Sequence, residues 1–223
     1  MNTNYKIVVN HLRSENIKMD KKEVLIYLQY TSDIIDEETD RLINECILEL
    51  KDLGELKYVY RIVNINKDNT TINFEDEIII KSKDLSKLLK NSNKAVLLAT
   101  TLGLAVENRI RYYSLSSLSK AIIFDACATA YIEALCDHTE AEIKTLAKKE
   151  GIGITFRYSP GYGDVSISHQ KDVVNSLNAT KLIGLTVSES SILIPRKSVT
   201  AFIGFDKTME VTASHNSTDK FDS

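Results

Sequence analysis

Residues that interrupt regular backbone structure are distributed unevenly along this chain of 223 residues, and this limits what each part can fold into. The sequence has only two prolines, Pro160 and Pro195, where average usage would give about eleven. Both lie in the last third, together with six of the eight glycines. Because proline and glycine interrupt helices and strands, we expect regular elements before residue 150 and a turn-rich segment after it. That segment is where we expect a functional site.

The composition indicates a globular protein without a strong charge preference. Apolar residues make up 43% of the chain and charged residues 26%. The 28 Lys and Arg residues against 31 Asp and Glu residues leave a formal net charge of −3. This balance argues against a general nucleic-acid-binding protein, which usually has a strongly basic face.

The sequence also bears on the cellular compartment. The longest nearly apolar run, 95–106, has about 12 residues, whereas a membrane-spanning helix needs about 20. No secretory signal is evident at the start of the chain. Three cysteines, none in a Cys-x-x-Cys pair, are interpreted as reduced thiols on helices: Cys46, Cys127 and Cys136. We therefore expect a cytoplasmic protein.

Hydrophobic periodicity predicts a single α+β domain, with a mainly antiparallel twisted sheet flanked by helices, including one long helix. This domain covers residues 20–205, between an N-terminal extension (1–19) and a polar C-terminal tail (206–223). Helices are expected near 20–28, 36–53, 82–89 and 168–177. A long helical region is expected over 103–150, with a break at 114–119, where four serines compete for backbone hydrogen bonds. Strands are expected at 58–65, 70–74, 77–81, 94–101, 152–158, 184–187, 191–194, 198–205 and 211–213.

The long helical region carries two stripes at i, i+4 spacing. The first is made of small residues, which allow another element to pack closely: Ala126, Ala130 and Ala134. The second is polar: Asp125, Thr129, Glu133 and Asp137. For the polar stripe a solvated face is favoured over a ligand-facing one, and both interpretations stay open.

The loop at 155–164 carries the strongest signal for binding. Arg157 offers a planar, permanently charged fork that can hold a carboxylate or a phosphate through two parallel hydrogen bonds. The run from Ser159 to Gly161 (Ser-Pro-Gly) predicts a type II turn, because proline fixes φ at the second position and glycine allows positive φ at the third. Tyr158 and Tyr162 can supply flat faces for a base or a cation. An ordinary connection between a strand and a helix, with a surface arginine, explains the residues about as well.

This loop resembles the Arg-x-Ser/Ala-Pro-Gly-Tyr motif of the activation domain of cobalamin-dependent methionine synthase. The resemblance extends over roughly residues 20–205 in the family's order. The similar segments are Tyr27-Leu28-Gln29-Tyr30, Ala99 to Gly103, Val106 to Arg111, Asp125-Ala126, Glu133 to Asp137, Lys181 to Ser190 and Pro195 to Thr200.

The resemblance implies an S-adenosylmethionine-binding activation subunit. Domains of that family bind S-adenosylmethionine and support the reductive methylation of an accidentally oxidised cobalamin. No cobalamin-binding Asp-x-His-x-x-Gly segment occurs in this sequence, so the cobalamin would be carried by a partner, a methionine synthase lacking its own activation domain. A flavodoxin-like protein would be an electron donor. The chain would act as the activation component of a methyltransferase rather than as an enzyme alone.

The same resemblance implies the site residues. Arg157 matches the arginine that holds the methionine carboxylate, and Ser159 matches a position that uses backbone atoms. Tyr158 lies between these two residues in the loop. Gly161 and Tyr162 complete the motif. Gln29 stands where the family has an aspartate near the ligand amine, and Glu133 is an alternative partner for that amine. Ile203 and Gly204 stand where the large enzymes have a tyrosine, so one wall of the pocket would differ. No catalytic or metal-binding residue is implied.

Two other classes of function stay open. One is a non-catalytic docking or regulatory protein for a corrinoid methyltransferase. The other is an unrelated hydrolase or nucleotide-binding protein in which the loop matches by chance, although no Walker A or Gly-x-Gly-x-x-Gly segment occurs.

Overall fold

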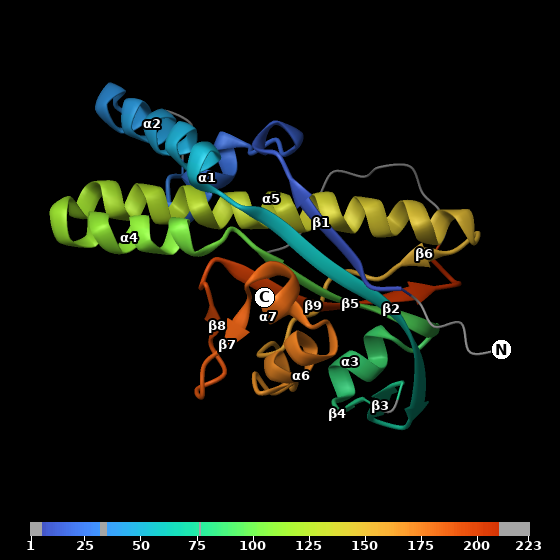
Figure 1. Cartoon of the computed structure of the whole chain (residues 1–223). Coiled ribbons are helices and arrows are strands. Elements are labelled where there is room, and N and C mark those ends of the chain that lie inside the picture. The colour runs from blue at the N-terminus through green and yellow to red at the C-terminus, as the bar shows by residue number, and fades with distance from the viewer. Residues whose placement is uncertain (1–5, 32–34, 76, 210–223) are drawn as a thin grey trace.

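An antiparallel sheet forms the centre of the molecule (Figure 1). The structure is a computed structural model that describes residues 6–31, 35–75 and 77–209. The strands run in the order β4-β3-β2-β5-β9-β6, and β1 pairs with β2 off this path. Their bounds are β1 Val8–Leu12, β2 Leu56–Asp68, β3 Thr71–Phe74, β4 Ile78–Lys81, β5 Ser92–Thr101, β6 Gly153–Ile154 and β9 Ser198–Asp206. A separate pair is formed by β7 (Thr186–Val187) and β8 (Leu193–Ile194).

The strand β2 is long enough to hold two partners along one edge. Its first half pairs with β1, from Leu56 to Tyr60, and its second half pairs with β3, from Ile65 to Asp68. The residues expected to form an N-terminal extension therefore include a strand of the main sheet. The strand expected at 211–213 lies outside the described residues.

Helices cover both faces of the sheet, which confirms the predicted α+β class. One face carries α1 (Lys21–Tyr27), α2 (Glu37–Leu53), α4 (Leu104–Ser116) and α5 (Leu118–Lys149). The other carries α3 (Lys83–Leu88), α6 (His169–Ser176) and α7 (Ala179–Ile183). A short 3-10 turn, η1 (Ser14–Asn16), precedes α1. No helix in the described part of the chain is long and apolar enough to cross a membrane.

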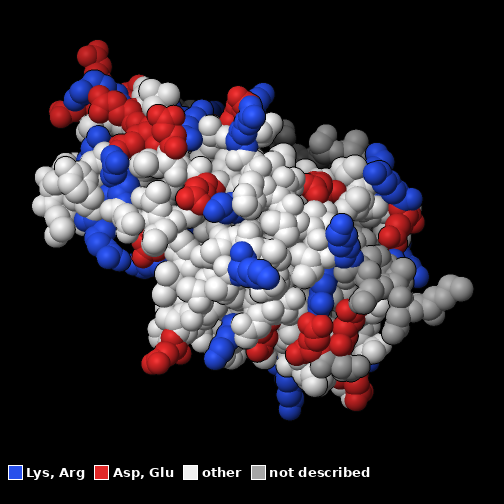
Figure 2. Space-filling view, in the orientation of Figure 1, with Lys and Arg blue, Asp and Glu red and all other residues white. Residues whose placement is uncertain are grey.

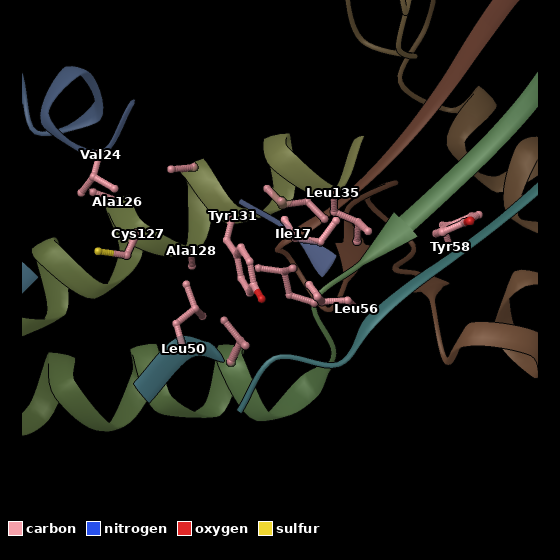
Figure 3. Close-up of a cluster of buried hydrophobic side chains, with 14 of the residues drawn as sticks. Ile17, Val24, Leu50, Leu56, Tyr58, Ala126, Cys127, Ala128, Tyr131 and Leu135 are labelled. Carbon is pink, nitrogen blue, oxygen red and sulfur yellow. The ribbon is translucent and has the colours of Figure 1, made fainter. Parts of the chain in front are cut away.

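Alternation along β5 explains how one sheet supports two cores. Val96 and Leu98 face the core on the α5 side, whereas Ala95, Leu97 and Ala99 face the core on the α6 side. Because successive side chains of a strand point to opposite faces, a strand covered on both faces needs a continuous apolar run. Figure 3 shows the first core, where Tyr131 of α5 lies near Leu50 and Leu56.

The long helix α5 begins where the serine-rich segment predicted a break. Ser117 has extended backbone angles (φ −159°, ψ 99°) and separates α4 from α5. Just before it, the hydroxyl groups of Ser114 and Ser116 donate to backbone carbonyls four residues earlier, at 2.9 Å and 3.0 Å. The helix has 32 residues, and Gly151 follows its end with a φ of +74°, as expected for a helix stop.

Charged side chains of both signs are interspersed on the face shown in Figure 2, in keeping with the small net charge. All three cysteines lie in helices, are buried and are not paired in disulfides: Cys46 in α2, and Cys127 and Cys136 in α5.

Candidate functional site

The loop after β6 is held against the edge of the sheet and then turns sharply. Tyr158 exchanges two backbone hydrogen bonds with Phe202 of β9, at 3.0 Å and 2.8 Å. The amide of Tyr162 donates to the carbonyl of Ser159 at 3.2 Å, and Gly161 has a φ of +97°. This is the type II turn predicted from the Ser-Pro-Gly run. A side chain other than glycine's would be strained at position 161.

A carboxylate anchors the far end of this loop to the N-terminus of α3. Asp164 accepts hydrogen bonds from the hydroxyl of Ser82 and from the amide of Lys83, the latter at 2.7 Å. These bonds hold the pKa of Asp164 below its ordinary value, with the Ser82 bond as the largest cause. The loop is therefore fixed at both ends, by β9 and by α3.

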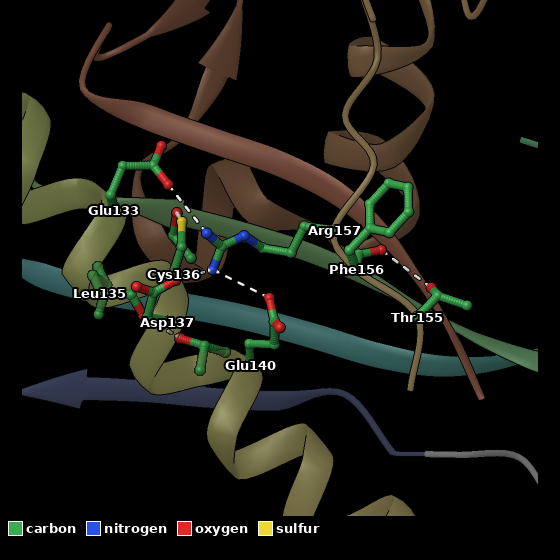
Figure 4. Close-up of polar contacts among 10 residues, drawn as sticks. Glu133, Leu135, Cys136, Asp137, Glu140, Thr155, Phe156 and Arg157 are labelled. Atoms are coloured by element: carbon green, nitrogen blue, oxygen red, sulfur yellow. Dashed lines mark hydrogen bonds and ion pairs between the residues drawn. The ribbon is translucent and has the colours of Figure 1, made fainter. Parts of the chain in front are cut away.

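Arg157 projects from this loop onto α5 and meets three carboxylates. Its guanidinium nitrogens lie 3.1 Å from Glu133, 2.8 Å from Asp137 and 3.3 Å from Glu140. Figure 4 shows the guanidinium between these side chains, beside the buried Cys136. The Arg157 side chain is 19% exposed. One positive and three negative groups leave this cluster, which we call the Arg157 cluster, with a net charge of −2.

The Cys136 thiol lies in a buried environment beside the cluster. Burial raises its pKa to about 12, and this outweighs the opposite influence of Arg157. Its sulfur lies 3.3 Å from the hydroxyl of Thr100 in β5. Because only the thiolate is a strong nucleophile, this cysteine is not expected to take part in covalent chemistry at neutral pH.

The polar stripe of α5 faces two cations from the C-terminal third. Arg157 forms ion pairs with Glu133 and Asp137. Lys197 lies 3.0 Å from the Asp125 carboxylate and donates to the Thr129 hydroxyl at 2.7 Å. The side chains of Asp125 and Asp137 are 50% and 73% exposed, so this face is solvated, as favoured from the sequence. Each member of the stripe also contacts a cation from another element.

Tyr27 belongs to the same surface and was not identified from the sequence as a site residue. Burial raises the pKa of its phenol, and the negative charges of Glu133, Glu23 and Asp137 raise it further, followed by Tyr162. Tyr27 also lines a pocket with Thr129 of α5, about one turn before Glu133. Glu140 was also missed, although it follows Asp137 by three residues on the same helical face, a spacing that could have found it.

The other site residues predicted from the sequence differ in their exposure and in their contacts. Tyr162 is 69% exposed, and its ring is open to a ligand. Tyr158 is partly buried against the core on the α6 side, and its hydroxyl donates to the carbonyl of Tyr162 at 3.2 Å. Gln29 is exposed just beyond α1, with a φ of +62°. Ser159 contributes its carbonyl to the turn, where it accepts from the Tyr162 amide.

Ile203 and Gly204, which the sequence resemblance placed at one wall of the pocket, are closely surrounded by other residues. Ile203 is buried in the core on the α5 side. A Cβ atom at Gly204 would lie 2.6 Å from Leu89 Cδ2 and 3.1 Å from Thr155 Cγ2. Thr155 also accepts from the Gly204 amide at 2.8 Å, so β6 and the start of the loop cover this position.

Comparisons with known proteins bear on the fold. The amino-acid sequence matches no protein-family model and no curated protein. The structure is similar to the crystal structure of the MetH reactivation domain bound to AdoHcy, with a TM-score of 0.70 and 13% sequence identity, over 93% of this chain and 81% of that chain. The chain has the fold of that domain. The resemblance noted in the sequence is therefore confirmed at the level of the fold, which is that of the MetH reactivation domain.

Within this fold, the described residues offer binding groups rather than a metal centre. No three His, Cys, Asp or Glu side chains within 6–31, 35–75 and 77–209 are placed to hold a metal ion. The candidate site consists of the Arg157 cluster, the turn at 159–162 and the exposed tyrosines beside them.

Proposed function

We propose that this chain binds S-adenosylmethionine at the Arg157 cluster and supports the reductive methylation of cob(II)alamin on a partner methionine synthase. The observation that carries the proposal is an arginine and three carboxylates gathered between a glycine turn and the long helix, in a chain with the MetH reactivation fold. The solved domain with that fold is bound to AdoHcy (S-adenosylhomocysteine), the demethylated form of the proposed ligand.

The charges of the cluster fit the amino-acid part of this ligand. Arg157 can hold a carboxylate through its planar fork. Glu133 and Asp137 can accept from an ammonium group, so a ligand carrying both charges can exchange with the ion pairs that these two carboxylates make with Arg157. S-adenosylmethionine has one carboxylate, one ammonium and one sulfonium, and its net charge of +1 opposes the −2 of the cluster.

The surrounding residues would orient the rest of the ligand. The turn from Ser159 to Tyr162 exposes backbone groups to which a ligand can come close. Tyr162 and Tyr27 offer aromatic faces, which attract cations such as a sulfonium. Gln29 adds an amide beyond α1. Tyr158 supports the turn through its bond to the Tyr162 carbonyl.

The chemistry would belong to the ligand and to the corrinoid of the partner. An external reductant supplies one electron to cob(II)alamin, and the sulfonium gives up its methyl group to cobalt while sulfur keeps an electron pair as a thioether. The residues of this chain hold and orient the methyl donor. The partner would be a methionine synthase without its own activation domain, the reductant a flavodoxin-like protein, and the compartment the cytoplasm.

A second candidate is a non-catalytic docking or regulatory protein for a corrinoid methyltransferase. The observation that favours it is that Arg157 already has three carboxylate partners, so a ligand carboxylate must compete for it.

A methyl-transfer assay distinguishes the two candidates. The chain is mixed with a methionine synthase truncated after its cobalamin domain, a reductant and S-adenosylmethionine labelled in its methyl group. We expect the cob(II)alamin absorption to fall and the label to move to the corrinoid. Arg157→Ala should abolish the transfer. Arg41→Ala is the matched control, since it removes an exposed ion pair with Glu45 within α2.

Each other outcome has a definite meaning. A stable complex without label transfer would favour the docking protein. If no heat is measured with S-adenosylmethionine at millimolar concentration, with or without the partner, the methyl-donor function is wrong.

A further inference from the structure

A groove runs along the α4–α5 hairpin beside the candidate site. Its first part has a volume of about 420 Å³ and is lined largely by apolar side chains of α1, α4 and α5, among them Tyr27, Leu118 and Ile122. Its second part, of about 370 Å³, shares Ile110, Ser114 and Asp125 with the first and extends to Arg111, Arg196 and Lys197. The two parts therefore form one groove with an apolar end and a basic end.

The apolar end has large side chains exposed at its rim. Leu118 and Ile122, which line it, are 71% and 54% exposed. Leu115 does not line the groove but follows its lining residue Ser114 in α4, and it is 88% exposed. Single exposed leucines are common, but a group of them around a groove marks an interaction surface. Figure 2 shows uncharged surface at the tip of the hairpin, on the left.

The basic end has an excess of positive charge. Lys197 is balanced by Asp125 at 3.0 Å. Glu107 accepts from the backbone amide of Arg196 at 2.8 Å and lies 3.9 Å from the guanidinium of Arg111. Across the described ranges, no side chain forms a hydrogen bond or ion pair with the guanidinium of Arg196. Three cations and two carboxylates thus leave one positive charge for an acidic partner.

We propose that this groove is the docking surface for the corrinoid-carrying partner, which presents a helix with apolar residues along one face and carboxylates at one end. The inference rests on the proposed function, which requires a partner in trans. A protein helix fits better than a small molecule because the most exposed apolar side chains lie on the rim, where a small ligand would leave them in water. Tyr27 and Thr129 both line the groove, and Thr129 precedes Glu133 of the Arg157 cluster by about one turn of α5, so a partner bound there would sit beside the proposed methyl donor.

Binding measurements with two groove variants test this inference. The probe is a methionine synthase truncated after its cobalamin domain, with its affinity measured by fluorescence anisotropy. Leu118→Glu should weaken binding at least tenfold, because truncating or charging a central apolar contact costs more than about 1.4 kcal/mol. Arg196→Glu should weaken it about fivefold and reduce its salt dependence. The matched controls, Ile79→Glu on β4 and Lys171→Glu on α6, alter exposed side chains elsewhere and should leave the affinity unchanged.

The affinity for S-adenosylmethionine, measured by calorimetry, separates the docking surface from the ligand site. We expect it to be unchanged in all four variants. If both groove variants bind the partner as tightly as the unmodified chain, the docking surface is wrong, while the proposed function stands. A dimer of this chain in sedimentation experiments that Leu118→Glu dissociates would assign the groove to a second copy and overturn the inference. A chain that binds the partner through this groove but not S-adenosylmethionine would support the docking surface and contradict the methyl-donor function.

Discussion

The polar stripe of α5 faces one cation at each end, and the two ends are balanced differently. Near the start of the helix, Lys197 is paired with Asp125 and the Thr129 hydroxyl, which makes a neutral group. Further along, Arg157 meets three carboxylates, which leaves a net charge of −2. The two cations are similarly buried, with side chains 16% and 19% exposed. A neutral pair is complete as a structural contact, whereas an excess of negative charge favours an additional cation. The same helical face can therefore hold a structural end and a binding end.

Removing each cation in turn is the strongest test of this difference. We expect Arg157→Ala to lower the affinity for S-adenosylmethionine about a hundredfold, because a buried charged hydrogen-bond pair typically contributes 2–5 kcal/mol when one partner is removed. Lys197→Ala should change the affinity less than about threefold. Calorimetry measures both. Equal losses in the two variants would show that the two ends of the stripe do not differ in function.

The net charge of the Arg157 cluster predicts a preference between two ligands. S-adenosylmethionine has one more positive charge than S-adenosylhomocysteine, and we expect it to bind about tenfold more tightly, since a charge several ångströms away contributes about 1–2 kcal/mol at an effective dielectric near 20. The double variant Glu133→Gln, Asp137→Asn should reduce the preference to about twofold. Asp125→Asn, at the neutral end, serves as the control. A preference that persists in the double variant would assign the discrimination to other groups.

Part of this site could be predicted from local sequence, because the responsible interactions are local. The type II turn follows from Pro160 and Gly161, and the break before α5 from its serines. The Arg157 cluster depends on long-range packing: i, i+4 spacing places Glu133 and Asp137 on one face of α5, but it does not say which residue faces them.

The distinction between local and long-range interactions also explains where the predicted strands differ from those in the structure. The strand β1 was missed because its five residues, from Val8 to Leu12, are half exposed and do not alternate, so pairing with β2 and not local pattern defines them. The strand expected over 152–158 is reduced to β6 and a single bridge at Tyr158. Between them, the Thr155 hydroxyl accepts a hydrogen bond from the amide of Gly204. The sequence pattern does not predict this contact.

The stability of the two ends should also differ. Lys197→Ala leaves one carboxylate without its cation, and we expect it to lower the free energy of unfolding by about 1 kcal/mol and the melting temperature by about 3 °C. Arg157→Ala leaves three neighbouring carboxylates, so we expect a larger loss, of about 2 kcal/mol at neutral pH. Thermal unfolding at pH 7 measures both losses, and an Arg157→Ala loss no larger than the Lys197→Ala loss would contradict the account of like-charge repulsion.

Different carboxylates anchor the segment that carries Arg157 and the segment that carries Lys197. Removing either anchor should change the ligand affinity less than removing Arg157 itself. Asp164 fixes the Arg157 loop to α3, whereas Glu107 accepts from the Arg196 amide beside Lys197. We expect Asp164→Asn to weaken S-adenosylmethionine binding about threefold through a less fixed loop, and Glu107→Gln to leave it unchanged.

The pH dependence of stability reports on the same anchor. Because folding lowers the pKa of Asp164, its contribution is fully present above the ordinary carboxyl value of 3.8 and is lost as pH falls through the lowered folded value. Urea unfolding between pH 2.5 and 5 should therefore show a smaller acid-dependent loss in Asp164→Asn than in the unmodified chain. An unchanged pH profile together with unchanged ligand affinity would mean that the contact with β9 at Tyr158 holds Arg157 in place without the α3 anchor.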